Sequence, residues 1–374
     1  MNEAQAATGL DDFGPADFKV GFAVYLEHLE GESNLDDQTA ARVRSMIQRR
    51  LTNRLEIEEW YKTHPEIGSV PVESPVFIVG LPRTGTTALI QIMSLDDRFR
   101  GPRMWEMVKP CPPPILEDEM SDPRRLAAKE QEEQMNLADP GRMALHLYDA
   151  DAPDEDGEIL TLSFGAQETV LPIFSYHNWW READLGPTMI YHRRVVQLLQ
   201  SRRPPNQWLF KAPTHLFHLD AIASAYPDAR FVMPHRDPAK AVASAVAFID
   251  SLTTPGTGMA SQMARFGQHH CDHLRIGMEN AIAARERIGE HRFFDVQHSE
   301  FVSDPLGTLS GINDFLGLED RPQDRERRAQ WHAANQSGTY GVHRYEPEEH
   351  GLSKAQLRSD FDFYTQRFDV PLED

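Results

Sequence analysis

Residues 76–87 read Val76-Phe77-Ile78-Val79-Gly80-Leu81-Pro82-Arg83-Thr84-Gly85-Thr86-Thr87 and contain the most informative pattern in the chain. The first four residues of this stretch form a short apolar, β-prone run between Pro75 and Gly80, which predicts a buried strand. The apolar spacing over residues 88–93 predicts a helix directly after the loop. Glycines let the loop backbone curl so that successive N–H groups point inward, and the helix N-terminus adds its own free amides. A loop of this build between a strand and a helix predicts a phosphate-binding site.

The cation supplied by this loop is unusual. The spacing from Gly80 to Gly85 matches the nucleotide-binding loop Gly-x-x-x-x-Gly-Lys-Ser/Thr, but Thr86 occupies the position of the lysine. The usual charge on the β- and γ-phosphates is therefore missing, and Arg83 offers a forked guanidinium in its place. A purely structural glycine turn is the alternative interpretation.

The loop resembles the phosphosulfate loop of sulfotransferases that use 3′-phosphoadenosine 5′-phosphosulfate (PAPS), which reads Pro-Lys/Arg-Ser/Thr-Gly-Thr-Thr. The matching residues are Pro82, Arg83, Thr84, Gly85, Thr86 and Thr87. The resemblance implies that these residues, with Gly80, hold the 5′-phosphosulfate of PAPS. In this family an arginine at a strand end and a serine eight residues later hold the 3′-phosphate, and Arg236 and Ser244 have that spacing here. Arg344, in a glycine-rich segment, is either a further phosphate contact or an exposed loop arginine.

The resemblance also implies four catalytic residues, namely Arg83, Glu106, Lys211 and His215. Lys211 follows a predicted strand at the edge where α/β sheets bind ligands, and would act at the bridging oxygen between phosphate and sulfate; a lysine that only extends to solvent is the alternative. Transfer also needs a base for the acceptor's proton. Glu106 lies where tyrosylprotein sulfotransferases carry a catalytic glutamate. Cytosolic sulfotransferases have a histidine two residues after the lysine, where this chain has Pro213, and His215 follows two residues later. We favour Glu106 as the base, although it could instead pair with Arg103, and His215 could instead be a helix-capping or packing residue.

Strand and helix patterns alternate along the chain. The expected strands are 76–79, 208–210, 230–233 and 293–296, and the expected helices are 88–93, 215–226, 238–249 and 305–316. This alternation predicts an α/β fold with a parallel central sheet flanked by helices. The family resemblance implies the P-loop-like nucleotide-binding fold of sulfotransferases. The stretch 295–305 also resembles the family's Tyr-Glu-Asp-Leu-x-x-Asp-Pro segment, with His298 in place of tyrosine.

The chain is expected to have two parts. Residues 1–72 form a helical segment packed on the core, because apolar residues recur at helical spacing in 38–60. Residues 73–374 form the α/β domain, with an acidic and aromatic insertion at about 110–203. Five aromatic residues of the insertion fit either an apolar acceptor pocket or core packing: Phe164, Phe174, Tyr176, Trp179 and Trp180.

The charge, the cysteine count and the apolar runs of the chain limit which partners and which cell compartment are expected. The 374 residues carry 38 Lys and Arg against 58 Asp and Glu, a net charge of −20 that disfavours nucleic acid. The two cysteines suggest neither a disulfide framework nor a zinc site, and with the absence of a signal sequence they favour a cytoplasmic location. The longest nearly apolar run, 241–249, is too short to cross a bilayer, so no integral membrane segment is expected. The histidines at 269, 270 and 273 are interpreted as packing or surface residues, so no metal is expected.

The sequence therefore predicts a PAPS-dependent sulfotransferase that moves a sulfuryl group to a hydroxyl of a small molecule, lipid or glycan, without a metal and with a carboxylate as base. A nucleoside-triphosphate kinase with a degenerate phosphate loop is one alternative. A non-catalytic nucleotide-binding protein is the other. The sequence leaves the acceptor and the oligomeric state open.

Overall fold

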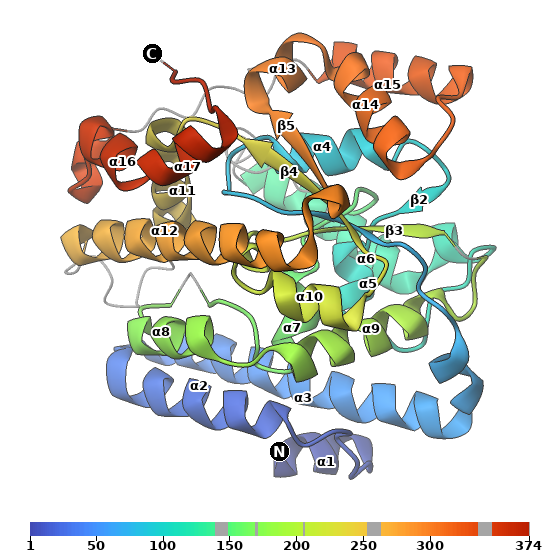
Figure 1. Ribbon diagram of the computed structural model, residues 1–374. Coiled ribbons are helices and arrows are strands. Elements are labelled where there is room, and N and C mark those ends of the chain that lie inside the picture. The colour runs from blue at the N-terminus through green and yellow to red at the C-terminus, as the bar shows by residue number, and fades with distance from the viewer. Residues whose placement is uncertain (139–148, 169–170, 205, 253–262, 336–345, 374) are drawn as a thin grey trace.

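The computed structural model describes residues 1–138, 149–168, 171–204, 206–252, 263–335 and 346–373 (Figure 1). Its centre is a parallel sheet in the order β2-β3-β1-β4-β5. The strands are β1 (Val76–Ile78), β2 (Phe99–Arg100), β3 (Gln207–Lys211), β4 (Arg230–His235) and β5 (Phe293–Gln297). The predicted parallel sheet flanked by helices is confirmed, and β1, which leads into the glycine loop, is the middle strand.

Side chains alternate between the two faces of the sheet. Phe77 pairs in register with Phe210 of β3 and Phe231 of β4, so three aromatic rings lie side by side on one face. Val76 and Ile78 point to the opposite face. All of these residues are buried, as expected for a parallel sheet covered on both sides.

Helices cover both faces (Figure 1). On the face of Val76 lie α4 (Thr86–Met93), α13 (His298–Ser303), α14 (Pro305–Leu316) and α15 (Pro322–Ala334). On the aromatic face lie α9 (Gly186–Gln200), α10 (Leu219–Ala225) and α12 (Met263–Ile288). The helix after β4, α11 (Pro238–Leu252), packs on α12 and on α16 (Lys354–Asp360), which α17 (Asp362–Phe368) follows.

The N-terminal helices form a further layer beneath α9 and α8 (Phe174–Glu182) (Figure 1). They are α1 (Asn2–Thr8), α2 (Phe18–Glu32) and α3 (Asp37–Thr63). Between β2 and β3 lie α5 (Met104–Val108), α6 (Pro123–Ala138), α7 (Gly157–Thr161), α8 (Phe174–Glu182) and α9. Tyr25 of α2 contacts Phe164 and Tyr176, with ring centroids 5.7 and 5.4 Å apart, so the N-terminal layer shares a core with the insertion.

Several expected boundaries differ from the structure. The helix expected at 215–226 begins at Leu219, because a 3-10 turn over Pro213–Phe217 precedes it. The segments β2 and α12 were not predicted: β2 has two residues, too few to show a strand periodicity, and α12 has a polar composition.

Of the five aromatics in the insertion, four are fully buried and Trp179 is partly buried against the core. None of the five lines the two cavities described below, so core packing is the interpretation that fits.

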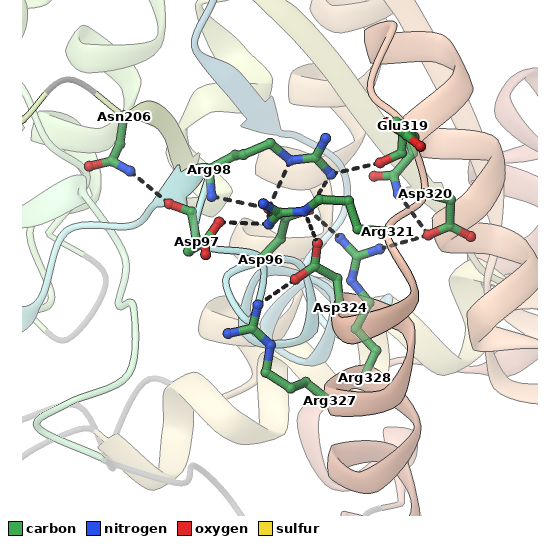
Figure 2. Close-up of polar contacts among 11 residues, drawn as sticks. Asp96, Asp97, Arg98, Asn206, Glu319, Asp320, Arg321, Asp324, Arg327 and Arg328 are labelled. Atoms are coloured by element: carbon green, nitrogen blue, oxygen red, sulfur yellow. Dashed lines mark hydrogen bonds and ion pairs between the residues drawn. The ribbon is translucent and has the colours of Figure 1, made fainter.

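Figure 2 shows a network of carboxylates and guanidinium groups that includes Asp96, in the turn after α4, and Asp324 of α15. The fully buried Asp96 accepts hydrogen bonds from Arg98 at 2.6 Å, Arg321 at 2.9 Å and Arg328 at 3.3 Å. Asp324, also buried, binds Arg321 again. The network ties α15 to the turn after α4 and so holds the helix that begins at the glycine loop.

Four histidines pack at the interface between α8 and α12. The ring centroid of His177 lies 5.2 Å from that of His269 and 6.0 Å from those of His270 and His273. Burial lowers the pKa of His177 to about 4 and that of His269 to about 3, and it lowers the pKa of the other two well below the usual value. Within the described residues, no group of three or more His, Cys, Asp or Glu side chains could hold a metal ion.

We expect this histidine cluster to make the protein sensitive to acid. The unfolded chain takes up protons near the ordinary histidine pKa of 6.5, whereas folded His177 stays neutral to about pH 4 and the pKa values of the other three histidines are also lowered by burial. Stability is therefore unaffected above pH 7 and falls as the pH drops toward 5, by about 2 kcal/mol for His177 alone. Thermal unfolding between pH 7.5 and 5 checks this. His270→Leu should flatten the dependence, while the same scan of His291→Gln, at an exposed site, should match the wild type. A Tm independent of pH would contradict it.

Candidate functional site

The candidate site lies where the carboxyl ends of the strands meet. The chain leaves β1 toward β2 on one side of the sheet and leaves β4 toward β5 on the other, so the crevice between β1 and β4 is the topological switch point. Arg83 follows β1, Lys211 ends β3, Arg236 follows β4 and His298 follows β5. The fold thus brings residues that are far apart in sequence to one edge.

The glycine loop has the geometry that the sequence predicts for a phosphate cradle. Arg83 has φ 65° and Gly85 has φ 90°, and left-handed backbone at a non-glycine residue is costly and concentrates at functional sites. Gly80 is needed for close approach, because a Cβ there would lie 2.9 Å from the Pro234 carbonyl oxygen of β4. Thr84 is fully buried and its hydroxyl donates to the Leu81 carbonyl at 2.8 Å, so this side chain shapes the loop.

Arg236 and Ser244, the residues predicted to hold the 3′-phosphate, lie against Arg83 of the glycine loop. The Arg83 Nε donates to the Ser244 hydroxyl on α11 at 3.2 Å, and the Arg236 Nη1 donates to the Arg83 carbonyl at 3.0 Å. The remaining edge of the Arg236 fork binds Glu373, with Nε–Oε1 at 2.8 Å and Nη2–Oε2 at 2.9 Å. Burial acts against the charged form of Glu373, but Arg236 holds the pKa of this carboxyl below its usual value. The Arg236 guanidinium, which is predicted to bind a phosphate, is therefore already bound to the Glu373 carboxylate.

Lys211 lies at the centre of the edge. Its Nζ is 2.7 Å from the Glu155 Oε1 and 3.3 Å from the Thr87 hydroxyl of the glycine loop. The lysine side chain is 3% exposed, whereas the Glu155 side chain is 39% exposed. Lys211 is thus a buried cation between the loop and a carboxylate that solvent and ligands can reach.

Two cavities meet at this carboxylate. One, of about 400 Å³, is lined by residues predicted to bind nucleotide: Pro82, Arg83, Gly85, Thr86, Thr87, Arg236 and Ser244. The other, of about 890 Å³, lies between α5, α6, α7 and the end of α11. Glu155, Gln167 and Phe248 line both cavities. A group held on the glycine loop and a second molecule in the larger cavity would meet beside Glu155.

The favoured base, Glu106, is not brought to either cavity. It is fully buried, accepts a hydrogen bond from Arg100 at 2.8 Å and lies in the first turn of α5, where it reaches back to the Arg103 N–H at 3.4 Å. Burial lowers the pKa of Arg100 to about 10. The Arg103 guanidinium binds Glu119 rather than Glu106. The surroundings of Glu106 are those of a structural carboxylate at a helix start.

The alternative base, His215, is also buried and lines neither cavity. Its Nε2 lies 2.7 Å from the Asp156 Oδ2, which the Nε2 of His192 contacts at 3.0 Å. Burial acts against ionisation of Asp156, but the two histidines hold the pKa of this carboxyl well below its usual range. An ionised carboxylate can only accept, so both imidazoles donate from Nε2, and that atom of His215 has no lone pair for a substrate proton.

Sequence reasoning missed Glu155 and Glu373. Glu155 belongs to the acidic cluster of the insertion, and no spacing relates it to Lys211, 56 residues later. Glu373 is 137 residues from Arg236. The concentration of acidic residues at 149–158 was the one available signal for Glu155. Arg344, a predicted phosphate contact, lies outside the described residues.

The glycine loop, Lys211, Arg236 and the described part of the insertion all fall within residues 75–322, and these residues match the model of the sulfotransferase family. This chain belongs to the sulfotransferase family. The match confirms the predicted family and does not favour the kinase or the non-catalytic alternative.

Two solved sulfotransferases have the same fold. STF9 from Mycobacterium avium is 29% identical, with a TM-score of 0.91 over 100% of this chain and 96% of that chain. STF1 from Mycobacterium tuberculosis is 30% identical, with a TM-score of 0.85 over 96% of each chain. The similarity extends beyond the cofactor motifs to nearly the whole length, including the N-terminal helices.

Two sequence relatives are named for their acceptor. The omega-hydroxy-beta-dihydromenaquinone-9 sulfotransferase Stf3 of Mycobacterium bovis is 27% identical over 274 residues, which are 67% of this chain and 65% of that protein. Stf3 of Mycobacterium tuberculosis matches with the same values. The match thus spans less than two thirds of the length of these relatives. In the described part of this chain, no helix combines the length and the apolar character needed to cross a bilayer.

Proposed function

We propose that this sulfotransferase transfers a sulfuryl group from PAPS to an alcohol, with Glu155 as the general base. PAPS would supply a sulfuryl group attached to a phosphate that leaves as it is transferred. The observation that carries the proposal is the meeting of Lys211, Thr87 and Glu155 where the loop cavity joins the larger cavity. Glu155 replaces Glu106 in this role because Glu106 reaches neither cavity.

The described residues fit a doubly phosphorylated nucleotide. The amides of the glycine loop and the N-terminus of α4 would hold the 5′-phosphosulfate, with Arg83, Thr86 and Thr87 beside them. Arg236 and Ser244 would hold the 3′-phosphate, and the carboxylate of Glu373 on the Arg236 fork supports an anion site there. Lys211 would stabilise the charge that develops on the leaving phosphate oxygen. Glu155 would accept the proton of the attacking hydroxyl.

The acceptor we propose is an amphiphilic alcohol. Apolar side chains of α5 and α6 line one wall of the larger cavity, including Met104, Trp105, Val108 and Met135, and charged side chains such as Arg49, Arg124 and Glu158 line other parts of it. Such a wall suits an apolar body whose hydroxyl reaches Glu155. The Stf3 relatives are named for a sulfotransferase activity on a hydroxylated menaquinone, which agrees with this class. Transfer of labelled sulfate from PAPS to a hydroxylated isoprenoid quinone, compared with a hydrophilic sugar acceptor, tests the proposal, and transfer to the sugar alone would contradict it.

Glu373 should compete with the 3′-phosphate for Arg236. Glu373→Gln removes the competing charge, so we expect affinity for 3′,5′-ADP to rise by about two- to fivefold, the range of a partly exposed ion pair. Affinity for 5′-AMP, which lacks the 3′-phosphate, should not change. Calorimetric titration of both nucleotides measures this. Glu290→Gln is the matched control, because Glu290 binds Arg285 and Arg367 and not Arg236. Weaker binding of 3′,5′-ADP by Glu373→Gln would contradict the competition.

A further inference from the structure

Asp156 lies next to the proposed base and is fully buried, yet it touches neither cavity. It is the N-cap residue of α7, a position where an aspartate normally accepts a hydrogen bond from the helix amides. Here its side chain makes no capping bond. The carboxylate points instead to the end of β3, where Oδ1 accepts the backbone N–H of Lys211 at 2.9 Å.

Two consecutive carboxylates therefore hold one lysine at both ends. Asp156 binds the main chain of Lys211, and Glu155 binds its Nζ at 2.7 Å. The segment that carries Glu155 has no strand or helix of its own before α7 begins at Gly157. The bond from Asp156 to β3 is thus a direct link between this segment and the sheet edge, and it fixes where Glu155 leaves the backbone.

The two histidines hold Asp156 itself. His215 and His192 both contact Oδ2, and His192 Nδ1 is 2.7 Å from the Tyr226 hydroxyl. Every member of this chain is buried. A carboxylate with three hydrogen bonds in a dry setting is rigidly held, because breaking any one of them leaves a buried polar group without a partner.

We propose that Asp156 is a positioning residue that sets the Glu155 carboxylate against Lys211 for proton transfer. The proposal rests on the function proposed above, in which Glu155 is the base. It also gives His215 a role different from the one implied by the family resemblance: His215 supports Asp156 and exchanges no proton with the substrate. Displacement of a catalytic group by about 1 Å can cost 10²-fold in rate, so the effect on turnover should be large.

A double-mutant cycle separates positioning from general structural damage. Asp156→Asn keeps an oxygen for the Lys211 N–H but turns an amide N–H toward the two donating imidazoles, so the side chain should shift from its place. We expect this to lower kcat by about 10- to 100-fold and to leave the affinity for 3′,5′-ADP within about threefold of the wild type. In Glu155→Gln, where no base remains to be positioned, adding Asp156→Asn should change kcat by less than about threefold. Asp149→Asn, a charge change in the same acidic segment, is the control and should change kcat by less than about twofold.

The outcomes are distinct. If the losses of the two single variants multiply in the double variant, Asp156 acts independently of Glu155 and the positioning role is wrong. A parallel loss of nucleotide affinity in Asp156→Asn would also overturn it. Full turnover by Glu155→Gln alone would overturn the base assignment, and the positioning proposal with it.

A second pair of variants covers the case in which Asp156→Asn does not fold. His215→Gln keeps a donor for the Asp156 carboxylate, whereas His215→Ala removes it. We expect His215→Ala to lower kcat by about tenfold and His215→Gln to recover most of that loss, with unchanged affinity for 3′,5′-ADP. Equal, near-complete loss in both variants would make His215 the proton acceptor and overturn the proposal.

Discussion

Replacing Glu155 by glutamine is expected to lower kcat by about 10²- to 10⁴-fold, the usual contribution of a general base. The amide cannot accept the acceptor's proton, although it can still accept a hydrogen bond from the Lys211 Nζ, which lies 2.7 Å from Oε1 in the native protein. Nucleotide binding should therefore be kept. Steady-state kinetics with PAPS, together with calorimetry of 3′,5′-ADP, separates the loss of turnover from loss of binding.

Glu106→Gln provides the comparison, because it makes the same chemical change at the other candidate base. Glu106 is fully buried and bound to Arg100, so its replacement weakens a buried charge pair. We expect a loss of about 1–3 kcal/mol in the free energy of unfolding. Turnover per folded molecule should stay near that of the wild type. The reverse pattern, with a stable but inactive Glu106→Gln and an active Glu155→Gln, would return the base to Glu106.

Replacing Lys211 by methionine should have a comparable effect, lowering kcat by about 10²- to 10³-fold. The side chain is 3% exposed and its Nζ lies between Thr87 and Glu155, so its charge is felt with little solvent screening. The charge on the leaving phosphate appears as the sulfuryl bond breaks, so the loss should fall on kcat more than on KM for PAPS.

Lys240→Met is the control for Lys211→Met. Lys240 lies in the first turn of α11, close in sequence to Arg236, but does not line the loop cavity. Its replacement should leave kcat within about twofold of the wild type. A rise in KM for PAPS at constant kcat in Lys211→Met would show that the lysine only binds the ground state.

The first strand, the glycine loop and the helix after it could be predicted because each depends on a pattern of neighbouring residues. The strand of Val76, the loop ending at Thr87 and the helix after it follow from apolar spacing and glycine placement, and the structure confirms them. The pairing of Arg236 with the loop follows from the parallel sheet, which brings all carboxyl ends to one edge. Such rules apply only to residues attached to regular elements.

The proposed base, Glu155, could not be predicted from such local patterns. Glu155 sits in an irregular segment of the insertion, and its contact with Lys211 depends on how that whole insertion packs. Glu106 was predicted to be the base because it follows the helix after the glycine loop. In the structure it is buried and bound to Arg100. From the sequence alone, the aromatic stretch around Tyr176 fits an acceptor pocket as well as a packed core. The ring contact between Tyr176 and Tyr25 of the N-terminal layer shows that it belongs to the core.

We propose that the glycine loop and Arg236 together bind the two ends of a doubly phosphorylated adenosine. Calorimetric titration of 3′,5′-ADP in the presence of EDTA, with the wild type and Arg236→Ala, tests this most directly. We expect single-site binding without metal by the wild type and a loss of at least about tenfold in Arg236→Ala, because the forked contact to the 3′-phosphate is gone. No binding by the wild type, or a preference for ATP with magnesium, would contradict this assignment of the site.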